Sequence, residues 1–258
     1  MARKTSRPTV LMIHGAFCGP WSMDGFKRAF EKAGYRVKVP ALRFHDRATP
    51  PDALATTGLA DFVADLEREI AALDEAPILL GYSMGGLLAQ LLATRRAMRA
   101  LILLATCSPW GVPPSTLFEI GSAQAMLLST GFWNRILEPN RDVALAASLH
   151  QLPREERDAV FSRLVPESGR ATFETLHWGL DMKRASEVDC GKITCPLLLL
   201  SGGEDRINPP GTVARTAALY KDRARHEIFP GMGHWLIGEP GWEKVAARAV
   251  AWADGLKE

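Results

Sequence analysis

The stretch PILLGYSMGGLLAQLL, residues 77–92, constrains the fold of this chain more than any other part of the sequence. Its apolar start has strand character, and the later apolar residues recur at intervals of three and four, which predicts a helix with one buried face. Between them lies Gly81-Tyr82-Ser83-Met84-Gly85, which has the form GxSxG. A sharp strand-to-helix turn leaves no room for a β-carbon on either flank of its apex. An ordinary turn serine is the alternative, but strand, helix and both glycines together favour a strained turn that presents Ser83.

Segments of strand and helix character alternate along most of the chain. Besides the stretch above, we expect strands at residues 9–13, 35–39, 100–105, 196–200 and 225–229, and helices at 21–33, 59–73, 211–220 and 241–253. A continuous apolar run is typical of a parallel strand that is buried on both faces. Residues 41–58, which include two adjacent prolines, are expected to form a loop. The alternation predicts a parallel sheet that is covered by helices on both faces.

The alternation breaks after residue 106. From there to residue 194 the sequence has no clear strand, and helical segments are expected near 115–130, 141–151, 153–164 and 168–181. This region resembles an inserted helical cap more than a second domain with its own core. A chain of 258 residues is long enough for one α/β domain with an insertion. We therefore expect a core domain formed by residues 1–106 and 196–258, and a cap formed by residues 107–195.

Charge and cysteine usage exclude several classes of function. The chain has 31 Lys and Arg against 29 Asp and Glu and no cluster of like charges, so nothing indicates a nucleic acid or an anionic membrane surface as a partner. The apolar run behind the basic N-terminus is too short for a signal peptide or a membrane span. The cysteines lack the spacing of a zinc site or a disulfide scaffold. We therefore expect a cytoplasmic protein with free thiols at Cys18, Cys107, Cys190 and Cys195.

Candidate functional residues follow the ends of the expected strands, where ligands bind in open parallel sheets. Four segments stand at such positions: His14-Gly15-Ala16, Ser83, Gly202-Gly203-Glu204-Asp205 and Gly231-Met232-Gly233-His234. A serine hydroxyl is a weak nucleophile at neutral pH, and it needs an imidazole to take its proton and a carboxylate to orient that imidazole. The side chains of Ser83, His234 and Asp205 can fill these three roles.

The order Ser83, Asp205 and His234 on this framework resembles the α/β-hydrolase superfamily. The resemblance spans nearly the whole chain and rests on the first His-Gly, GYSMGG, GGEDRINPP and GMGHW. It implies an α/β-hydrolase fold, with a mostly parallel, doubly wound sheet and an inserted helical cap. Similar proteins begin with two further strands that this chain lacks, so the resemblance implies about six strands. It also implies an esterase- or lipase-like serine hydrolase that forms an acyl-enzyme and needs no metal or organic cofactor.

The resemblance also assigns roles to single residues. The oxyanion hole is expected from the backbone N–H groups of Met84 and Ala16, with Phe17 as the fallback for the second donor. Glu204 and Asp205 are adjacent and either carboxylate can orient an imidazole, but the G-x-x-D turn of similar hydrolases favours Asp205. His14 is expected to order its loop through backbone hydrogen bonds. The remaining histidines have no setting comparable to that of the proposed base; they are His45, His150, His177 and His226.

The substrate is expected to be a small-molecule ester with a largely apolar acyl or aryl group, such as a monoacylglycerol, a simple carboxylic ester or a lactone. Trp110, which follows the strand at 100–105, is the leading pocket candidate, and Phe17, Trp178 and Trp235 are further ones. Other reactions of the same triad stay open, namely C–C bond hydrolysis, thioester hydrolysis, aminopeptidase-like cleavage, perhydrolysis and cyanohydrin cleavage. A non-catalytic binding protein is a further alternative, although such proteins usually lack a triad residue.

Overall fold

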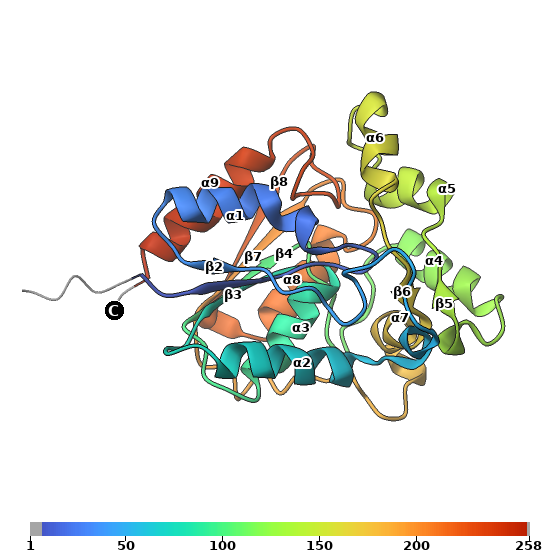
Figure 1. The fold of residues 1–258 in the computed structure, drawn as a ribbon, viewed down its shortest axis with the longest axis horizontal. Helices are drawn as coiled ribbons and strands as arrows, with labels where there is room; N and C mark the ends of the chain where they lie inside the picture. The colour runs from blue at the N-terminus through green and yellow to red at the C-terminus, as the bar shows by residue number, and fades with distance from the viewer. Residues whose placement is uncertain (1–6, 257–258) are drawn as a thin grey trace, which may run out of the picture.

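A computed structural model describes residues 7–256 of the chain, and a six-stranded sheet lies at its centre (Figure 1). The strand order is β2-β1-β3-β4-β7-β8, and every neighbouring pair is parallel. These strands are β1 (Val10–Ile13), β2 (Val37–Lys38), β3 (Ile78–Tyr82), β4 (Ala100–Leu104), β7 (Leu197–Gly202) and β8 (Ala224–Phe229). The expected sheet of about six strands is therefore confirmed, and this sheet is wholly parallel.

Helices cover both faces of the sheet, as the alternation of elements predicted (Figure 1). Successive residues of a strand point to opposite faces, so that Leu79 packs in the core on one face and Leu80 in the core on the other. Because both faces are covered, β1, β3, β4 and β7 are buried along their whole length. The first face carries α2 (Leu59–Ala71), α3 (Met84–Ala93) and α8 (Pro210–Ala218), and the second carries α1 (Asp24–Lys32) and α9 (Trp242–Asp254).

Strand order reverses between β1 and β3. The chain runs from β1 outward to β2 at the sheet edge and then returns to β3 on the other side of β1. A reversal of this kind opens a crevice at the carboxyl ends of the two strands, where α/β proteins bind their ligands. The loop after β1, which contains Ala16, and the turn after β3, which contains Ser83, therefore lie next to each other.

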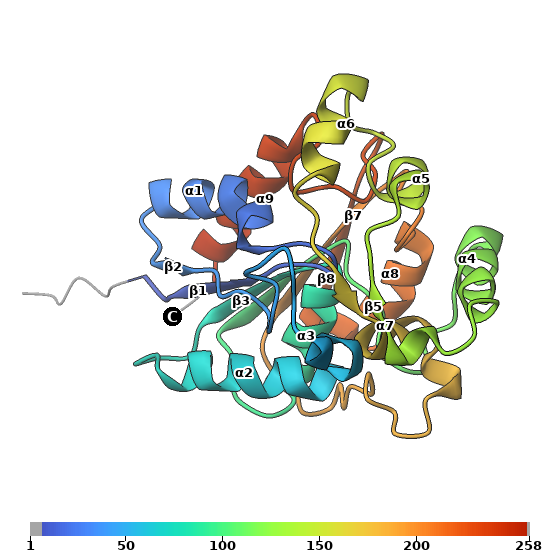
Figure 2. The same ribbon diagram turned by 45° about the vertical axis from the view of Figure 1, so that its right-hand side comes forward.

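The segment between β4 and β7 leaves the sheet and gathers on one side of the molecule (Figure 2). It contains a pair of two-residue antiparallel strands, in which Ile136 is opposite Ser168, so the expectation of no strand in this region was wrong. Strands of two residues are too short to show a period of two in a sequence. Its elements are α4 (Leu117–Leu127), η3 (Phe132–Asn134), β5 (Ile136–Leu137), α5 (Arg141–Val143), η4 (Ala144–Ser148), α6 (Arg154–Phe161), β6 (Glu167–Ser168), α7 (Gly169–Leu176) and η5 (Trp178–Leu180).

Three short 3-10 helices complete the fold: η1 (Pro20–Met23), η2 (Asp52–Thr56) and η6 (Lys221–Arg223). The second of them lies inside the expected loop at residues 41–58. All four cysteines are free thiols. Within the part of the chain that the structure describes, no helix has the length and apolar character needed to cross a membrane.

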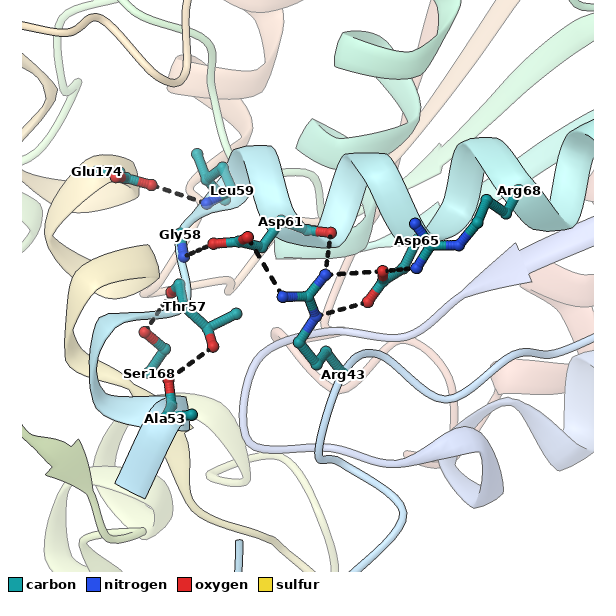
Figure 3. Close-up of polar contacts among 10 residues, drawn as sticks. All are labelled: Arg43, Ala53, Thr57, Gly58, Leu59, Asp61, Asp65, Arg68, Ser168 and Glu174. Atoms are coloured by element: carbon teal, nitrogen blue, oxygen red, sulfur yellow. Dashed lines mark hydrogen bonds and ion pairs between the residues drawn. The ribbon is translucent and has the colours of Figure 1, made fainter. Parts of the chain in front are cut away.

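Polar contacts fix the segment 107–195, for which we keep the name cap, to the start of α2 (Figure 3). Ser168 Oγ donates a hydrogen bond to the backbone carbonyl of Thr57 at 2.5 Å. The Glu174 carboxylate accepts the backbone N–H of Leu59 at 2.7 Å, and a β-carbon at Gly58 would lie only 2.9 Å from that carboxylate. Glycine at position 58 therefore lets a side chain of α7 reach the N-terminus of α2.

Candidate active site

The turn after β3 holds Ser83 in a backbone conformation that residues other than glycine rarely adopt. Its φ is 52° and its ψ is −120°, and strain of this kind costs about 1–3 kcal/mol. A β-carbon at Gly81 would overlap the backbone of Gly85, and a β-carbon at Gly85 would overlap the carbonyl of Ile13. Both glycines of the GxSxG pattern are therefore required by close backbone approach, as the sequence predicted.

We expect Gly85→Ala to lower the free energy of unfolding by about 3 kcal/mol or more, because the added methyl group meets backbone atoms that cannot move aside. The matched control is Gly121→Ala in α4, where a β-carbon meets no atom within 4 Å. Alanine is favoured over glycine inside a helix by up to about 1 kcal/mol, so this control should be at least as stable as the parent. Urea unfolding of the three proteins measures the difference. Equal stability of the two variants would contradict the packing argument.

A hydrogen-bonded chain joins Ser83, His234 and Asp205. His234 Nε2 lies 3.1 Å from Ser83 Oγ, and His234 Nδ1 lies 2.9 Å from Asp205 Oδ2. All three residues are buried, with exposed fractions of 7%, 5% and 4%. The carboxylate receives the Nδ1–H, which leaves the lone pair of Nε2 facing the serine hydroxyl. This arrangement can remove a proton from Ser83 Oγ.

The structure also distinguishes the two adjacent acids, Glu204 and Asp205, of which the resemblance favoured Asp205. Asp205 Oδ1 accepts the backbone N–H groups of Ile207 at 2.8 Å and Asn208 at 2.9 Å, so both carboxylate oxygens have partners. Glu204, in contrast, has an exposed side chain. Asp205 is therefore the acid that contacts His234.

Three residues of the site were not singled out from the sequence. Tyr82 packs its ring 5.3 Å from the ring of His234. Cys107 Sγ lies 3.8 Å from Ser83 Oγ, and Asn208 Nδ2 reaches both the carbonyl of Ala105 and that sulfur. Tyr82 and Asn208 lie inside the motifs GYSMGG and GGEDRINPP, and Cys107 lies just past the end of β4, so the two motifs and the strand end were the available signals.

The two amides expected to form an oxyanion hole are unpaired. The Met84 N–H is at the first position of α3, where helix amides have no partner within the helix. Neither this group nor the Ala16 N–H has a protein acceptor among residues 7–256. The Phe17 N–H, the fallback donor, instead donates to Glu167 Oε2 at 3.2 Å. Ala16 and Met84 are thus the amides that remain available to a substrate oxygen.

His14 orders the loop after β1 through backbone contacts. Its Nδ1 lies 2.9 Å from the carbonyl of Gly15 and its Nε2 accepts the N–H of Leu42 at 3.0 Å, so Nδ1 carries the proton. Complete burial lowers the pKa of His14 to about 3 and keeps the ring neutral. These contacts agree with the structural role predicted for it.

The other histidines differ from one another. His45 Nε2 lies 3.0 Å from Glu167 Oε2 in the buried interior, a setting that the sequence did not indicate. His226 Nε2 pairs with Ser201 Oγ at 2.9 Å on β7 and β8. His177 packs against Phe132 and Phe173, and burial lowers its pKa. None of these three rings contacts Ser83.

The candidate pocket residues differ in burial and in the residues they pack against. Trp235 is buried at 5% exposure, with its ring 5.9 Å from those of Tyr82 and Trp21, so it packs in the core beneath the site. Trp110 and Trp178 form an edge-to-face pair at 5.6 Å, and both are half-buried. Their aromatic pair joins the first residues of the cap, after β4, to η5.

A buried carboxyl group contacts the backbone next to His234. Glu239 is 1% exposed, and its Oε1 accepts the backbone N–H of Gly233 at 2.6 Å. Its Oε2 and the Nε2 of His150 are both buried without a partner among the described residues. Burial raises the pKa of Glu239 from its ordinary value of 4.5 to about 7. The site therefore contains a second buried acid that gains its charge near neutral pH.

Glu239→Gln is expected to stabilise the protein at pH 8 but not near pH 5. Between pH 4.5 and about 7 the folded protein keeps a proton on Glu239 that the unfolded chain releases, so the stability of the parent falls as pH rises through this window. The full shift corresponds to about 3 kcal/mol at most. Glutamine stays neutral and can still accept the Gly233 N–H. Urea unfolding at both pH values tests this, and a difference that does not grow with pH would contradict it.

Comparisons with known proteins agree with the fold. The family described as "alpha/beta hydrolase fold" matches residues 8–240. A mouse sn-1-specific diacylglycerol lipase, ABHD11, is 25% identical over 239 residues, which cover 89% of this chain and 76% of that protein. A carbendazim hydrolyzing esterase from Nocardioides is 26% identical over 250 residues, or 91% and 88% of the two chains. The crystal structure of Paleococcus ferrophilus monoacylglycerol lipase superposes with a TM-score of 0.72 at 21% identity, covering 98% of this chain and 97% of that one. The chain belongs to the α/β-hydrolase family.

Proposed function

We propose that the protein is a serine hydrolase that cleaves carboxylic esters through an acyl-enzyme. The observation that carries this proposal is the hydrogen-bonded chain from Ser83 through His234 to Asp205. Ser83 Oγ attacks the ester carbonyl carbon while His234 Nε2 takes its proton. His234 then gives this proton to the leaving alcohol, which departs and leaves the acyl group on Ser83. A water molecule attacks the acyl-enzyme with His234 again as the base, and the carboxylic acid is released.

We assign to the N–H groups of Ala16 and Met84 the stabilisation of the negative charge that develops on the carbonyl oxygen. Both amides lack protein acceptors in the described chain, and they flank Ser83 at the ends of neighbouring strands. Donors that are fixed before reaction cost no reorganisation, and the loss of one typically lowers kcat by about 10²–10³. The proposed oxyanion hole lies at the reversal of strand order between β1 and β3.

The proposed substrate is a small ester with an apolar acyl or aryl group, such as a monoacylglycerol, a simple carboxylic ester or a lactone. The lipase and esterase names of the mouse and Nocardioides relatives support an ester. The half-buried aromatic pair of Trp110 and Trp178, together with Phe17 beside Ala16, supplies apolar surface from the cap and the neighbouring loops. Trp235 is left out of the proposed pocket because it is buried against Tyr82.

The proposal is tested with a fluorophosphonate that reacts with activated serines, and with p-nitrophenyl esters of increasing acyl length. We expect one label per chain, located on Ser83 by peptide mass spectrometry, and hydrolysis rates that depend on acyl length. Thioester and C–C bond substrates in the same panel distinguish the other reactions of the triad. Absence of labelling would overturn the proposed serine hydrolase. It is the result that the alternative of a non-catalytic binding protein predicts. Hydrolysis rates that do not depend on acyl length and rise only with charged esters would contradict the proposed preference for apolar acyl or aryl groups.

A further inference from the structure

Three N–H groups converge on the carboxylate of Glu167, which belongs to β6 of the cap. Glu167 Oε2 accepts the backbone N–H of Phe17 at 3.2 Å and the Nε2–H of His45 at 3.0 Å. Glu167 Oε1 accepts the N–H of Ser168 at 2.7 Å. The side chains of Glu167 and His45 are both fully buried. A buried carboxylate is costly unless it is paired and hydrogen-bonded, and this one is both.

The contacts of His45 favour a positively charged ring. Its Nδ1 lies 2.9 Å from the backbone carbonyl of Arg43, which can only accept a hydrogen bond, and its Nε2 faces the carboxylate. Both ring nitrogens are therefore donors, which makes the ring an imidazolium. Burial by itself would lower the pKa of His45, but the charge and hydrogen bond of Glu167 outweigh it and raise that pKa. Burial would likewise raise the pKa of Glu167, and His45 reverses this and lowers it.

This ion pair holds the loop that contains the proposed oxyanion donor. The peptide N–H of Phe17 is bound by Glu167, and the carbonyl of Phe17 accepts the N–H of Val165, so the cap binds both sides of one residue. Phe17 has a φ of 59°, a strained value that persists only where the surroundings enforce it. Fixing the peptide unit between Ala16 and Phe17 restricts the backbone of Ala16. The direction of the Ala16 N–H therefore depends on contacts made by the cap.

We propose that Glu167, with its charge balanced by His45, is a positioning residue that aligns the Ala16 N–H for the oxyanion. Glu167 does not touch the reacting atoms, and it acts through the backbone of Phe17. The inference rests on the proposed function and names a determinant of the same site. On this proposal the oxyanion hole is complete only when β6 of the cap contacts the loop after β1.

The test compares Glu167→Gln with Glu174→Gln. Glu174 is the matched control because it is another buried cap carboxylate that accepts a backbone N–H of the core, that of Leu59 at 2.7 Å. Leu59 begins α2 and is not part of the loop after β1. Removal of a whole oxyanion donor lowers kcat by about 10²–10³, so a misaligned donor should lower it by about tenfold to a hundredfold. For Glu167→Gln we expect this fall in kcat, with KM within about threefold of the parent. For Glu174→Gln we expect an unchanged kcat.

A transition-state analogue separates positioning from general loosening of the cap. An alkyl boronic acid forms a tetrahedral adduct with the serine and places an oxygen in the oxyanion hole, whereas the alcohol product binds without one. We expect Glu167→Gln to weaken the boronic acid by the same factor as kcat/KM and to leave the inhibition constant of the alcohol unchanged. His45→Gln, which keeps a donor to Glu167 but removes the charge, should give a smaller change of the same kind.

Each outcome decides the inference. An unchanged kcat in Glu167→Gln, a rise in KM alone, or equal losses in the Glu167 and Glu174 variants would overturn it. If Glu167→Gln does not fold, an unchanged boronic acid affinity in His45→Gln would overturn it instead. Failure of the parent protein to react with a fluorophosphonate would count against the proposed function, so the two failures are distinguishable.

Discussion

Ser83→Ala is expected to lower kcat for ester hydrolysis by about a millionfold, because removal of the nucleophile of a serine triad costs about this much. Alanine retains the β-carbon and leaves His234 and Asp205 in place, so folding and substrate binding should be preserved. The unpaired N–H groups of Ala16 and Met84 are untouched, and they should support a small residual rate. The measurement is kcat with a p-nitrophenyl ester, together with fluorophosphonate labelling, which should disappear.

A matched control for this variant is Ser201→Ala. Ser201 is a buried serine whose Oγ also pairs with an imidazole, that of His226, at 2.9 Å. We expect this second pair to be without catalytic effect, so that Ser201→Ala keeps kcat within about twofold, as usual for a residue outside the reacting groups. A Ser83→Ala enzyme that keeps more than about a thousandth of the parent rate would contradict the assigned nucleophile.

Asp205→Asn is expected to lower kcat by about 10⁴-fold. The Oδ1 of an asparagine would keep the two backbone N–H groups that Asp205 Oδ1 accepts, from Ile207 and Asn208. Its NH₂ group would then point to Nδ1 of His234. Because an amide NH₂ can only donate, it would favour the tautomer with the proton on Nε2, which cannot take a proton from Ser83.

Glu204→Gln is the control for the adjacent acid. Glu204 has an exposed side chain, so its replacement should change kcat by less than about twofold. Both variants are measured by kcat and KM with the same ester. A large loss in Glu204→Gln together with an active Asp205→Asn would reverse the assignment of the acid.

Most of the fold could be predicted because its signals are local. The strand, glycine turn and helix around Ser83 lie within one short stretch, and β3 and α3 occur where the pattern indicated them. The buried parallel strands appear in the sequence as continuous apolar runs, as in β4 and β7. Position after a strand end, the GxSxG motif and the family resemblance together selected Ser83 and His234, and the structure brings these two residues within hydrogen-bonding distance.

The features that were not predicted depend on contacts between distant residues. His45 and Glu167 are separated by 122 residues, and nothing near either of them in the sequence indicates an ion pair. The pairing of β5 with β6 involves two residues on each strand, which is too few for a recognisable pattern. The choice of Asp205 over Glu204 came from the resemblance and not from the two residues themselves, because adjacent residues of equal charge give no local signal for which side chain turns inward.

The strand order has a consequence for the time at which the site forms during folding. Ser83 follows β3, whereas Asp205 and His234 follow β7 and β8, the last strands of the chain, and 151 residues separate the serine from the histidine. Contacts between residues so far apart in sequence form slowly, because the chain between them must first be ordered. The region around β1 and β3 is made first by the ribosome, and it contains the serine without its base. In a refolding experiment, recovery of hydrolysis therefore reports the docking of β7 against β4 and of β8 against β7.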